Sequence, residues 1–175
     1  MEFEHVSVLL QESVDWLVTD PDGIYVDCTL GGAGHSQKIA SLLSVRGRLI
    51  GIDQDEEALA AAQERLAKAA CRVDIVKANF KDLASVLSRL QVQAVNGVLF
   101  DLGVSSHQLD MAERGFSYMH DGPLDMRMDQ QTEKTAAFVV NTYSEEALAD
   151  LIWRYGEERW HKRIAQFIVL TRQKA

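Results

Sequence analysis

The chain has 175 residues, 47% of them hydrophobic and two of them proline, which suffices for an α/β domain with a smaller appendage. It contains no apolar run of the roughly 18 residues that a membrane span needs, and acidic residues near its N-terminus do not fit a secretory signal. The net charge of −8 argues against a generally basic, nucleic-acid-binding surface. We therefore expect a cytosolic protein with no membrane segment.

Strand and helix patterns alternate from the start of the chain. In chain order we expect a helix over 8–17, a strand over 24–28, a helix from Ser36, a strand over 48–53, a helix over 55–70, a strand over 72–76, a helix from Asp82 and a strand over 97–102. Ser36 and Asp82 are placed to cap their helices, and the first of these helices is expected to bury Ile39, Leu42 and Leu43.

This alternation predicts a parallel sheet with right-handed crossovers and the strand order 3-2-1-4. Ligands of such sheets bind at the carboxyl ends of the strands, here beside the switch point between strands one and four.

The two cysteines, Cys28 and Cys71, form no CxxC pair, so we interpret them as buried, reduced thiols and expect no metal site.

The pattern changes after Leu102. Residues 103–131 are irregular but not of low complexity, which favours a functional loop over a linker. Two helices follow: one is capped by Ser144, has an apolar face that includes Tyr155 and is ended by Gly156, and the other runs from about Glu157. The second is expected to bury its apolar residues, namely Trp160, Ile164, Phe167 and Ile168.

A sheet that ended at the fourth strand would leave an apolar edge without a partner. We therefore expect further strands and interpret the chain as the N-terminal part of a longer protein. Residues 154–175 carry six basic side chains against two acidic ones, a distribution that fits either local phosphate contact or a solvated helix face.

The segment IYVDCTLGGAGHS, residues 24–36, runs from an apolar strand into a glycine-rich turn, and the next strand, RLIGID, ends on Asp53. Glycines let a ligand approach the backbone, and an acid at the neighbouring strand end can accept both hydroxyls of a ribose. The third glycine of the dinucleotide fingerprint is replaced by Gln37. That replacement favours S-adenosylmethionine, which has no pyrophosphate, over a nicotinamide dinucleotide.

The ends of the other strands complete this predicted site. Asn79 and Phe80 follow strand three, where an adenine can stack or form hydrogen bonds, and Asp101 lies at the end of strand four near the reacting methyl group. For each of these residues a purely structural role also stays open. The glycines can serve only a tight turn, Asp53 can cap a helix, Phe80 can be core, and His35 can be an ordinary helix-start residue.

The chain resembles the MraW family, the ribosomal RNA small-subunit methyltransferases H that act on the N4 atom of cytosine. The matching segments are HVSVLLQES at 5–13, DGIYVDCTLGGAGHS at 22–36, GRLIGIDQD at 47–55, LFDLGVSSHQLD at 99–110, ERGFSYMHDGPLDMRMD at 113–129 and YGEERWHKRIA at 155–165. The resemblance implies a class I methyltransferase core (a Rossmann-like parallel sheet, incomplete here) over 1–106. It also implies a truncated helical substrate-recognition insertion over 107–175.

The resemblance further implies S-adenosyl-L-methionine as methyl donor and a cytosine in the decoding region of small-subunit (16S) ribosomal RNA as acceptor, in naked RNA or in the 30S subunit. Carried over by position, the cofactor-binding residues are Ala33, Gly34, His35, Asp53, Phe80, Asp101 and Gln108. The family usually has proline where this chain has His107, which bears on the placing of Gln108.

Asp101 is the candidate catalytic residue, because an acceptor beside the exocyclic amine of cytosine takes up the developing positive charge. The alternative is that Asp101 only holds the cofactor.

Candidate RNA contacts are Arg114, Arg127 and the stretch 154–174, although Arg127 can instead pair with Asp125 or Asp129. For Trp153 and Trp160, helix packing is favoured over base stacking. Two other functions stay open: a cofactor- or RNA-binding fragment without turnover, and a nicotinamide-dependent oxidoreductase.

Overall fold

Four parallel strands form the centre of the first part of the chain. They are β1 (Ile24–Asp27), β2 (Arg48–Asp53), β3 (Arg72–Lys77) and β4 (Gly97–Leu99), in the order β3-β2-β1-β4, which confirms the predicted order. This computed structural model describes residues 7–173, and the chain divides into two compact units, Met1–His107 and Gln108–Ala175. Because the strands are parallel, their carboxyl ends lie at one edge of the sheet.

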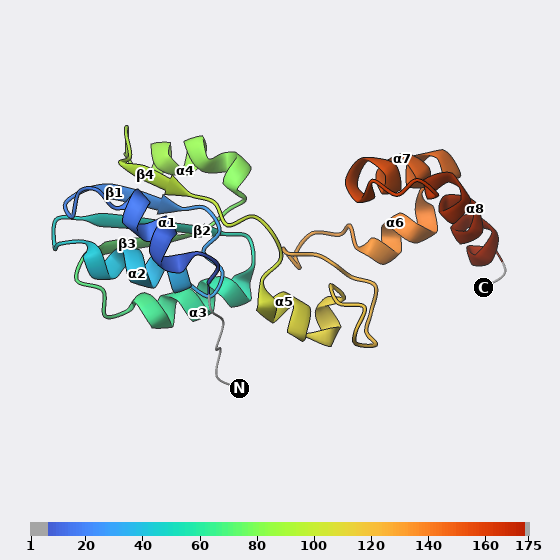
Figure 1. Cartoon of the computed structure of the whole chain (residues 1–175), viewed down its shortest axis with the longest axis horizontal. Helices are drawn as coiled ribbons and strands as arrows, with labels where there is room; N and C mark the ends of the chain where they lie inside the picture. Colours follow the sequence, from blue (N-terminus) through green and yellow to red (C-terminus); the bar gives the residue numbers. More distant parts are fainter. Residues whose placement is uncertain (1–6, 174–175) are drawn as a thin grey trace. The chain divides into compact units, whose positions relative to one another are not determined.

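Helices cover both faces of this sheet (Figure 1). One face packs against α1 (Leu10–Leu17), α2 (Gly34–Leu42) and α3 (Glu56–Leu66), and the other packs against α4 (Leu83–Arg89), which follows the short 3-10 helix η1 (Phe80–Asp82). Side chains of one strand alternate between the two cores: Tyr25 lies in the first and Val26 in the second, both fully buried. The sheet is therefore the middle of three layers.

The hydroxyl group of Tyr25 holds the turn that leads into β1. It donates a hydrogen bond to the carbonyl of Asp20 at 3.0 Å and accepts the backbone N–H groups of Thr19 and Asp20 at 3.1 and 2.9 Å. The turn that leads into the strand is thus held by a side chain of the core.

Two of the predicted helix caps are wrong. The α2 helix begins at Gly34 after Ala33, whose φ is +62°, and the Ser36 hydroxyl turns inward to Asp27 instead of capping. The carboxylate of Asp82 makes no capping hydrogen bond, because the chain already turns in η1, where Asn79 is the cap. Both α2 and α4 therefore begin without a side-chain capping hydrogen bond.

Burial also departs from the sequence pattern in places. Ile39 and Leu43 are buried as predicted, whereas Leu42 is 41% exposed. Strand β4 ends at Leu99 and not at Leu102, and its three residues are only half-buried. Among the described residues β4 pairs with β1 alone, so it lies at the edge of the sheet and Phe100 and Leu102 remain exposed.

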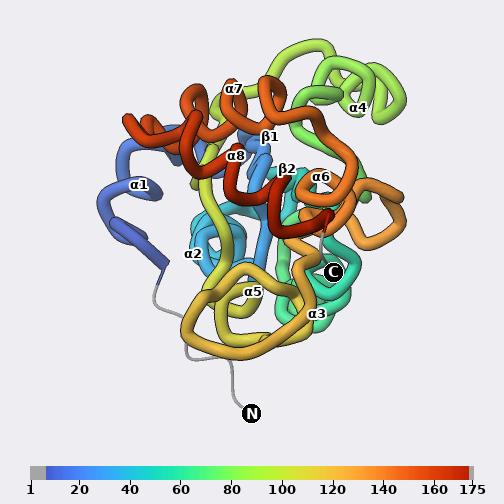
Figure 2. Tube along the Cα trace, turned by 90° about the vertical axis from the view of Figure 1, so that its right-hand side faces the viewer, coloured from blue at the N-terminus to red at the C-terminus, as the bar shows by residue number. Residues whose placement is uncertain are grey.

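The second unit is helical. It contains η2 (Ala112–Arg114), α6 (Ala136–Thr142), α7 (Glu145–Gly156) and α8 (His161–Arg172), and α5 (Ser106–Asp110) spans the division between the units. Helices α7 and α8 lie side by side (Figure 2), with Leu148, Ala149 and Ala165 buried between them. Ser144 caps α7 as predicted, by accepting the N–H of Ala147.

Other expectations for this unit are wrong. Helix α8 begins at His161, and Trp160, Ile164 and Phe167 are 56%, 37% and 55% exposed instead of buried. Tyr155, expected on the apolar face of α7, is also exposed. Ala165 is the residue of α8 that is fully buried against Leu148 and Ala149 of α7, whereas the large apolar side chains Ile164 and Phe167 remain exposed. Lys174, in the predicted basic stretch, lies outside the described residues.

Candidate active site

The glycine turn after β1 and the acid at the end of β2 are joined directly. Asp53 accepts the backbone N–H of Gly31 on Oδ2 at 2.8 Å and that of Asp55 on Oδ1 at 3.0 Å. Gly31 has a φ of +46°, a conformation that glycine adopts without steric cost. Each carboxylate oxygen can accept a further hydrogen bond, so Asp53 is fixed by the backbone and retains capacity for the two hydroxyls of a ribose.

A second carboxylate, that of Asp27, lies beneath this turn. Its side chain is 1% exposed and accepts the Ser36 hydroxyl at 2.7 Å and the N–H of Thr29 at 3.1 Å. Burial raises the pKa of Asp27, and the hydrogen bonds and the nearby His35 oppose that rise. Sequence reasoning did not select Asp27. The available signal was an acid at the last position of an otherwise apolar strand that runs into a glycine turn.

Asp101 lies just after β4, with only Phe100 between it and the last residue of the strand. Its backbone N–H donates to the Thr29 hydroxyl at 2.7 Å, and its side chain is 45% exposed. His35 Nδ1 lies 3.8 Å from Asp101 Oδ2, while His35 Nε2 lies 3.1 Å from the Val8 carbonyl. A carbonyl only accepts, so Nε2 carries the proton and Nδ1 faces the carboxylate. The structure thus brings together two of the predicted site residues.

An aromatic pair flanks the same edge of the sheet. The rings of Phe80 and Phe100 are edge to face, with centroids 5.8 Å apart, and the two residues are 41% and 46% exposed. The half-exposed faces suit an adenine, which stacks on aromatic rings. Phe100 was missed because it ends an apolar run and looks like a core residue of strand four.

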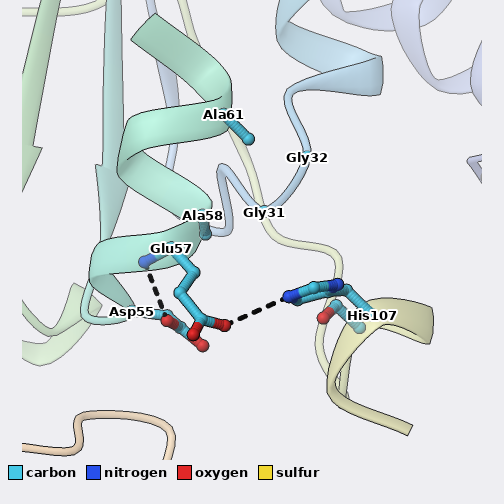
Figure 3. Close-up of a pocket in the computed structure, with 8 residues that line it drawn as sticks. Gly31, Gly32, Asp55, Glu57, Ala58, Ala61 and His107 are labelled. Atoms are coloured by element: carbon cyan, nitrogen blue, oxygen red, sulfur yellow. Dashed lines mark hydrogen bonds and ion pairs between the residues drawn. The ribbon is translucent and has the colours of Figure 1, made fainter. Parts of the chain in front are cut away.

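A small pocket lies between the glycine turn, the start of α3 and His107 (Figure 3). Its lining combines the turn, the start of α3 and the segment after β4, namely Gly31, Gly32, Asp55, Glu57, Ala58, Ala61, Ser105 and His107. Asp55 caps α3 by accepting the N–H of Glu57 at 3.1 Å. His107 Nε2 lies 3.1 Å from Glu57 Oε2, so the residue that departs from the expected proline ties its segment to α3.

The predicted cofactor residues fall into two groups. One group belongs to the first unit and lies at or just after the carboxyl ends of the strands: Ala33, Gly34, His35, Asp53, Phe80 and Asp101. Gln108 is buried on α5 and belongs to the second unit, so its role at the cofactor stays a prediction.

Two arginines proposed as RNA contacts have structural partners in the loop after η2. Arg114 is 3% exposed and donates to the carbonyls of Arg127 and Met128, both at 3.1 Å. Arg127 pairs with Asp125 at 2.6 Å, and this guanidinium lowers the pKa of Asp125. A Cβ at Gly115, whose φ is +69°, would lie 2.2 Å from the Pro123 carbonyl oxygen. Both arginines therefore hold a closely packed loop.

The basic stretch is more accessible. Lys162 and Arg163 are exposed on α8, and the guanidinium groups of Arg159 and Arg163 lie over the rings of Trp160 and Phe167 at 5.7 and 5.6 Å from the centroids. Such arginine and aromatic pairs can contact phosphates and bases.

Cys28 and Cys71 are buried as predicted, and burial followed by the charge of Asp27 raises the pKa of Cys28 to about 11. Within residues 7–173, no group of three or more His, Cys, Asp or Glu side chains is arranged to hold a metal ion. In that same part of the chain, every helix is too short or too polar to span a membrane.

Together, the strand order, the glycine turn and the acid of the next strand define the fold of a class I S-adenosylmethionine-dependent methyltransferase. A crystal structure from Clostridium thermocellum, assigned as an rRNA-methylase, matches with a TM-score of 0.50 and 24% identity over 57% of this chain and 54% of that chain. The model of the MraW methylase family matches residues 2–175, and the chain belongs to that family.

Curated relatives extend the comparison. The chain is 56% identical to the ribosomal RNA small subunit methyltransferase H of Clostridioides difficile over 172 residues, which are 98% of this chain and 55% of that protein. It is 55% identical to the protein of the same name from Symbiobacterium thermophilum, over 99% of this chain and 55% of that protein. The chain thus spans about half the length of the curated relatives it matches.

Proposed function

We propose that this chain provides the cofactor-binding core of an enzyme that transfers a methyl group from S-adenosylmethionine to the N4 atom of a cytosine in the decoding region of small-subunit ribosomal RNA. The relatives named above support the class of reaction and of substrate. The observation that carries the proposal is the fixed carboxylate of Asp53 beside the glycine turn, with Asp101 two strands away at the same edge of the sheet.

The residues at this edge fit S-adenosylmethionine better than a dinucleotide. A pyrophosphate is bound by N–H groups of a glycine turn, but the N–H of Gly31 is already donated to Asp53. A ribose needs a carboxylate, which Asp53 offers, and an adenine needs an apolar wall, which Phe80 and Phe100 offer. Ala33, Gly34 and His35 at the start of α2 would lie along the methionine part.

When bound, the donor supplies a methyl group already activated by a sulfonium. The task of the protein is then to hold the acceptor nitrogen about 3 Å from the methyl carbon, in line with the departing sulfur. The amine of cytosine is a weak nucleophile because its lone pair is delocalised into the ring. The half-exposed Asp101 carboxylate would accept a hydrogen bond from this amine and take up its proton as the N–C bond forms.

The substrate must present an unstacked base, which suits an unpaired RNA residue or one displaced from its stack. The exposed Lys162 and Arg163 are the proposed phosphate contacts, in naked RNA or in the 30S subunit. Affinity carried by such contacts falls steeply with salt, so a flat salt response would argue against them. A cytosolic location agrees with this substrate and stays a prediction.

Two measurements on this chain test the proposal. S-adenosylhomocysteine should raise the melting temperature and NAD should not, since only the former lacks a pyrophosphate. Labelled methyl groups should appear on small-subunit RNA or 30S particles, in N4-methylcytosine after nuclease digestion. Stabilisation by NAD alone would favour an oxidoreductase. Binding of S-adenosylhomocysteine without transfer to either acceptor would favour a cofactor-binding module without turnover.

A further inference from the structure

One hydroxyl group links the ends of β1 and β4. The last ladder hydrogen bond between these strands runs from the N–H of Cys28 to the carbonyl of Leu99 at 2.9 Å. Beyond it the two segments part, and the next link is the N–H of Asp101, which donates to Thr29 Oγ1 at 2.7 Å. The backbone of Asp101 is therefore fixed by a side chain after the sheet itself has ended.

Thr29 is in turn fixed by the buried carboxylate of Asp27. Its N–H donates to Asp27 Oδ1 at 3.1 Å, and its hydroxyl, which accepts from Asp101, lies 3.4 Å from the same oxygen. The Ser36 hydroxyl holds the other oxygen of Asp27 at 2.7 Å. A hydroxyl both donates and accepts, so Thr29 can connect a rigid, buried acceptor to a donor at the surface. Valine has the same shape but cannot make this connection.

The side-chain carboxylate of Asp101, in contrast to its backbone, faces His35. Because Nε2 of His35 is committed to the Val8 carbonyl, Nδ1 is directed at Asp101 Oδ2, but the separation of 3.8 Å is too long for a hydrogen bond. Of the other charged groups near this turn, Asp27 interacts with His35, and Arg65 on α3 donates to the carbonyl of Gly32 at 2.5 Å. Within residues 7–173, the backbone of Asp101 is thus held by Thr29 while its carboxylate accepts no hydrogen bond.

We propose that Thr29 is a positioning residue for Asp101: its hydroxyl sets the place of the Asp101 backbone so that the carboxylate meets the acceptor amine. The proposal rests on the proposed function, because it takes Asp101 to act on that amine. Small displacements of a reacting group are costly, and an error of about 1 Å can lower a rate roughly 100-fold. Thr29 therefore affects the rate of transfer without contacting substrate or donor.

Replacing Thr29 with valine or serine tests this proposal. Thr29→Val keeps the shape and removes the hydroxyl, whereas Thr29→Ser keeps the hydroxyl, and Thr171→Val on the exposed face of α8 is the matched control. Hydrogen exchange of the Asp101 amide, followed by NMR, reads the contact without any need for turnover. We expect exchange about 5- to 10-fold faster in Thr29→Val, the loss of one hydrogen bond, and unchanged exchange in Thr29→Ser and in the control.

Methyl transfer and cofactor affinity provide the second readout. Thr29→Val should lower the transfer rate by about 100-fold while the Kd for S-adenosylhomocysteine changes by less than about threefold, and Thr29→Ser should restore the rate. An Asp101 amide equally protected in Thr29→Val and wild type would overturn the proposal, and so would a Thr29→Ser variant as slow as Thr29→Val. If Thr29→Val does not fold, Thr29→Ala against Thr29→Ser gives the same comparison.

Failure of the proposed function has a different signature. A wild-type chain that does not bind S-adenosylhomocysteine refutes the cofactor assignment, and with it the reason for positioning Asp101. Normal binding and transfer in wild type, together with an Asp101 amide that is indifferent to the Thr29 hydroxyl, refute only the role of Thr29.

Discussion

Asp53 Oδ2 lies 2.8 Å from the backbone nitrogen of Gly31, and this hydrogen bond ties the end of β2 to the turn after β1. The two halves of the proposed ribose and methionine site are therefore one unit before any ligand binds. Preorganisation of this kind lowers the conformational cost of binding. It also explains why a glycine with φ of +46° is placed next to the acid, because the turn must aim its N–H group inward.

Asp53→Asn should weaken binding of S-adenosylhomocysteine by about 10- to 100-fold, because hydrogen bonds to a charged acceptor are worth roughly 1.5–3 kcal/mol. An asparagine amide would also place its N–H₂ against the N–H of Gly31 or of Asp55. Isothermal titration measures the affinity, and Glu64→Gln, exposed on α3, is the control. Equal affinities of wild type and Asp53→Asn would show that the ribose does not bind here.

Asp101→Asn separates a catalytic role from cofactor binding. If the carboxylate takes up the amine proton, transfer should fall at least about 100-fold, within the range typical of a lost general base. The Kd for S-adenosylhomocysteine should stay within about threefold, because the Asp101 backbone contact to Thr29 is retained. Single-turnover transfer and titration supply the two numbers. A variant with normal turnover refutes the catalytic role, and one with normal turnover only at high cofactor concentration assigns Asp101 to the cofactor.

Phe80→Ala and Phe100→Ala should each weaken S-adenosylhomocysteine by about 3- to 10-fold, the effect of one aromatic contact. The two rings support each other at 5.8 Å, so the double variant should lose less than the product of the two single effects. Phe167→Ala, at a half-exposed residue of the second unit, provides the control. If neither substitution changed the affinity for S-adenosylhomocysteine, the adenine would not bind against this pair of rings.

Tyr25→Phe should destabilise the first unit by about 1–3 kcal/mol, the cost of leaving buried polar groups without a partner. The lost hydroxyl serves two backbone N–H groups and one carbonyl at the entry to β1. Urea unfolding followed by amide signals of the sheet measures the change. Tyr118→Phe, at a residue that is 96% exposed, should have no effect. A neutral Tyr25→Phe variant would mean that water replaces the hydroxyl group.

Asp27 and Asp125 should give pH dependences of opposite sign. Burial raises the pKa of Asp27 above its ordinary value of 3.8, so the folded state binds its proton more tightly, and wild type should lose stability relative to Asp27→Asn as pH rises from that value. Arg127 lowers the pKa of Asp125, so its stabilisation is present above 3.8 and is lost as pH falls.

Unfolding of wild type, Asp27→Asn and Asp125→Asn across pH 3 to 7, followed separately in each unit, tests both signs. The deficit of Asp125→Asn should shrink toward low pH, and the relative gain of Asp27→Asn should grow toward neutral pH. If the stability differences of both variants from wild type changed in the same direction with pH, the direction of the pKa shift given for at least one of the two carboxylates would be wrong.

The sheet was predictable from the sequence because each apolar run is bounded by polar residues or glycine. Strand β2 has the predicted bounds, Arg48 and Asp53, and the order of the four strands follows from the alternation with helices. The local turns were not predictable in the same way. Ser36 looks like a helix cap, but the buried Asp27 is a stronger partner for its hydroxyl, and that contact spans nine residues.

Helix α8 shows a second limit of sequence reasoning. Its apolar spacing predicts a buried stripe that includes Ile164 and Phe167, yet these two side chains are exposed and Ala165 is the fully buried residue of the cluster with α7. Periodicity tells which residues share a face but not which face meets the neighbouring helix. The support of Asp101 by Thr29 was missed for a related reason, since the two residues are 72 positions apart and meet only through the topology of the sheet.

A crystal structure of this chain with S-adenosylhomocysteine tests the central claim most directly. We expect both ribose hydroxyls within hydrogen-bond distance of the Asp53 carboxylate, the adenine against Phe80, and the sulfur atom on the side of Asp101. A nucleoside bound away from the ends of β1 and β2, or electron density at Asp53 that contains only water at saturating ligand, would contradict it.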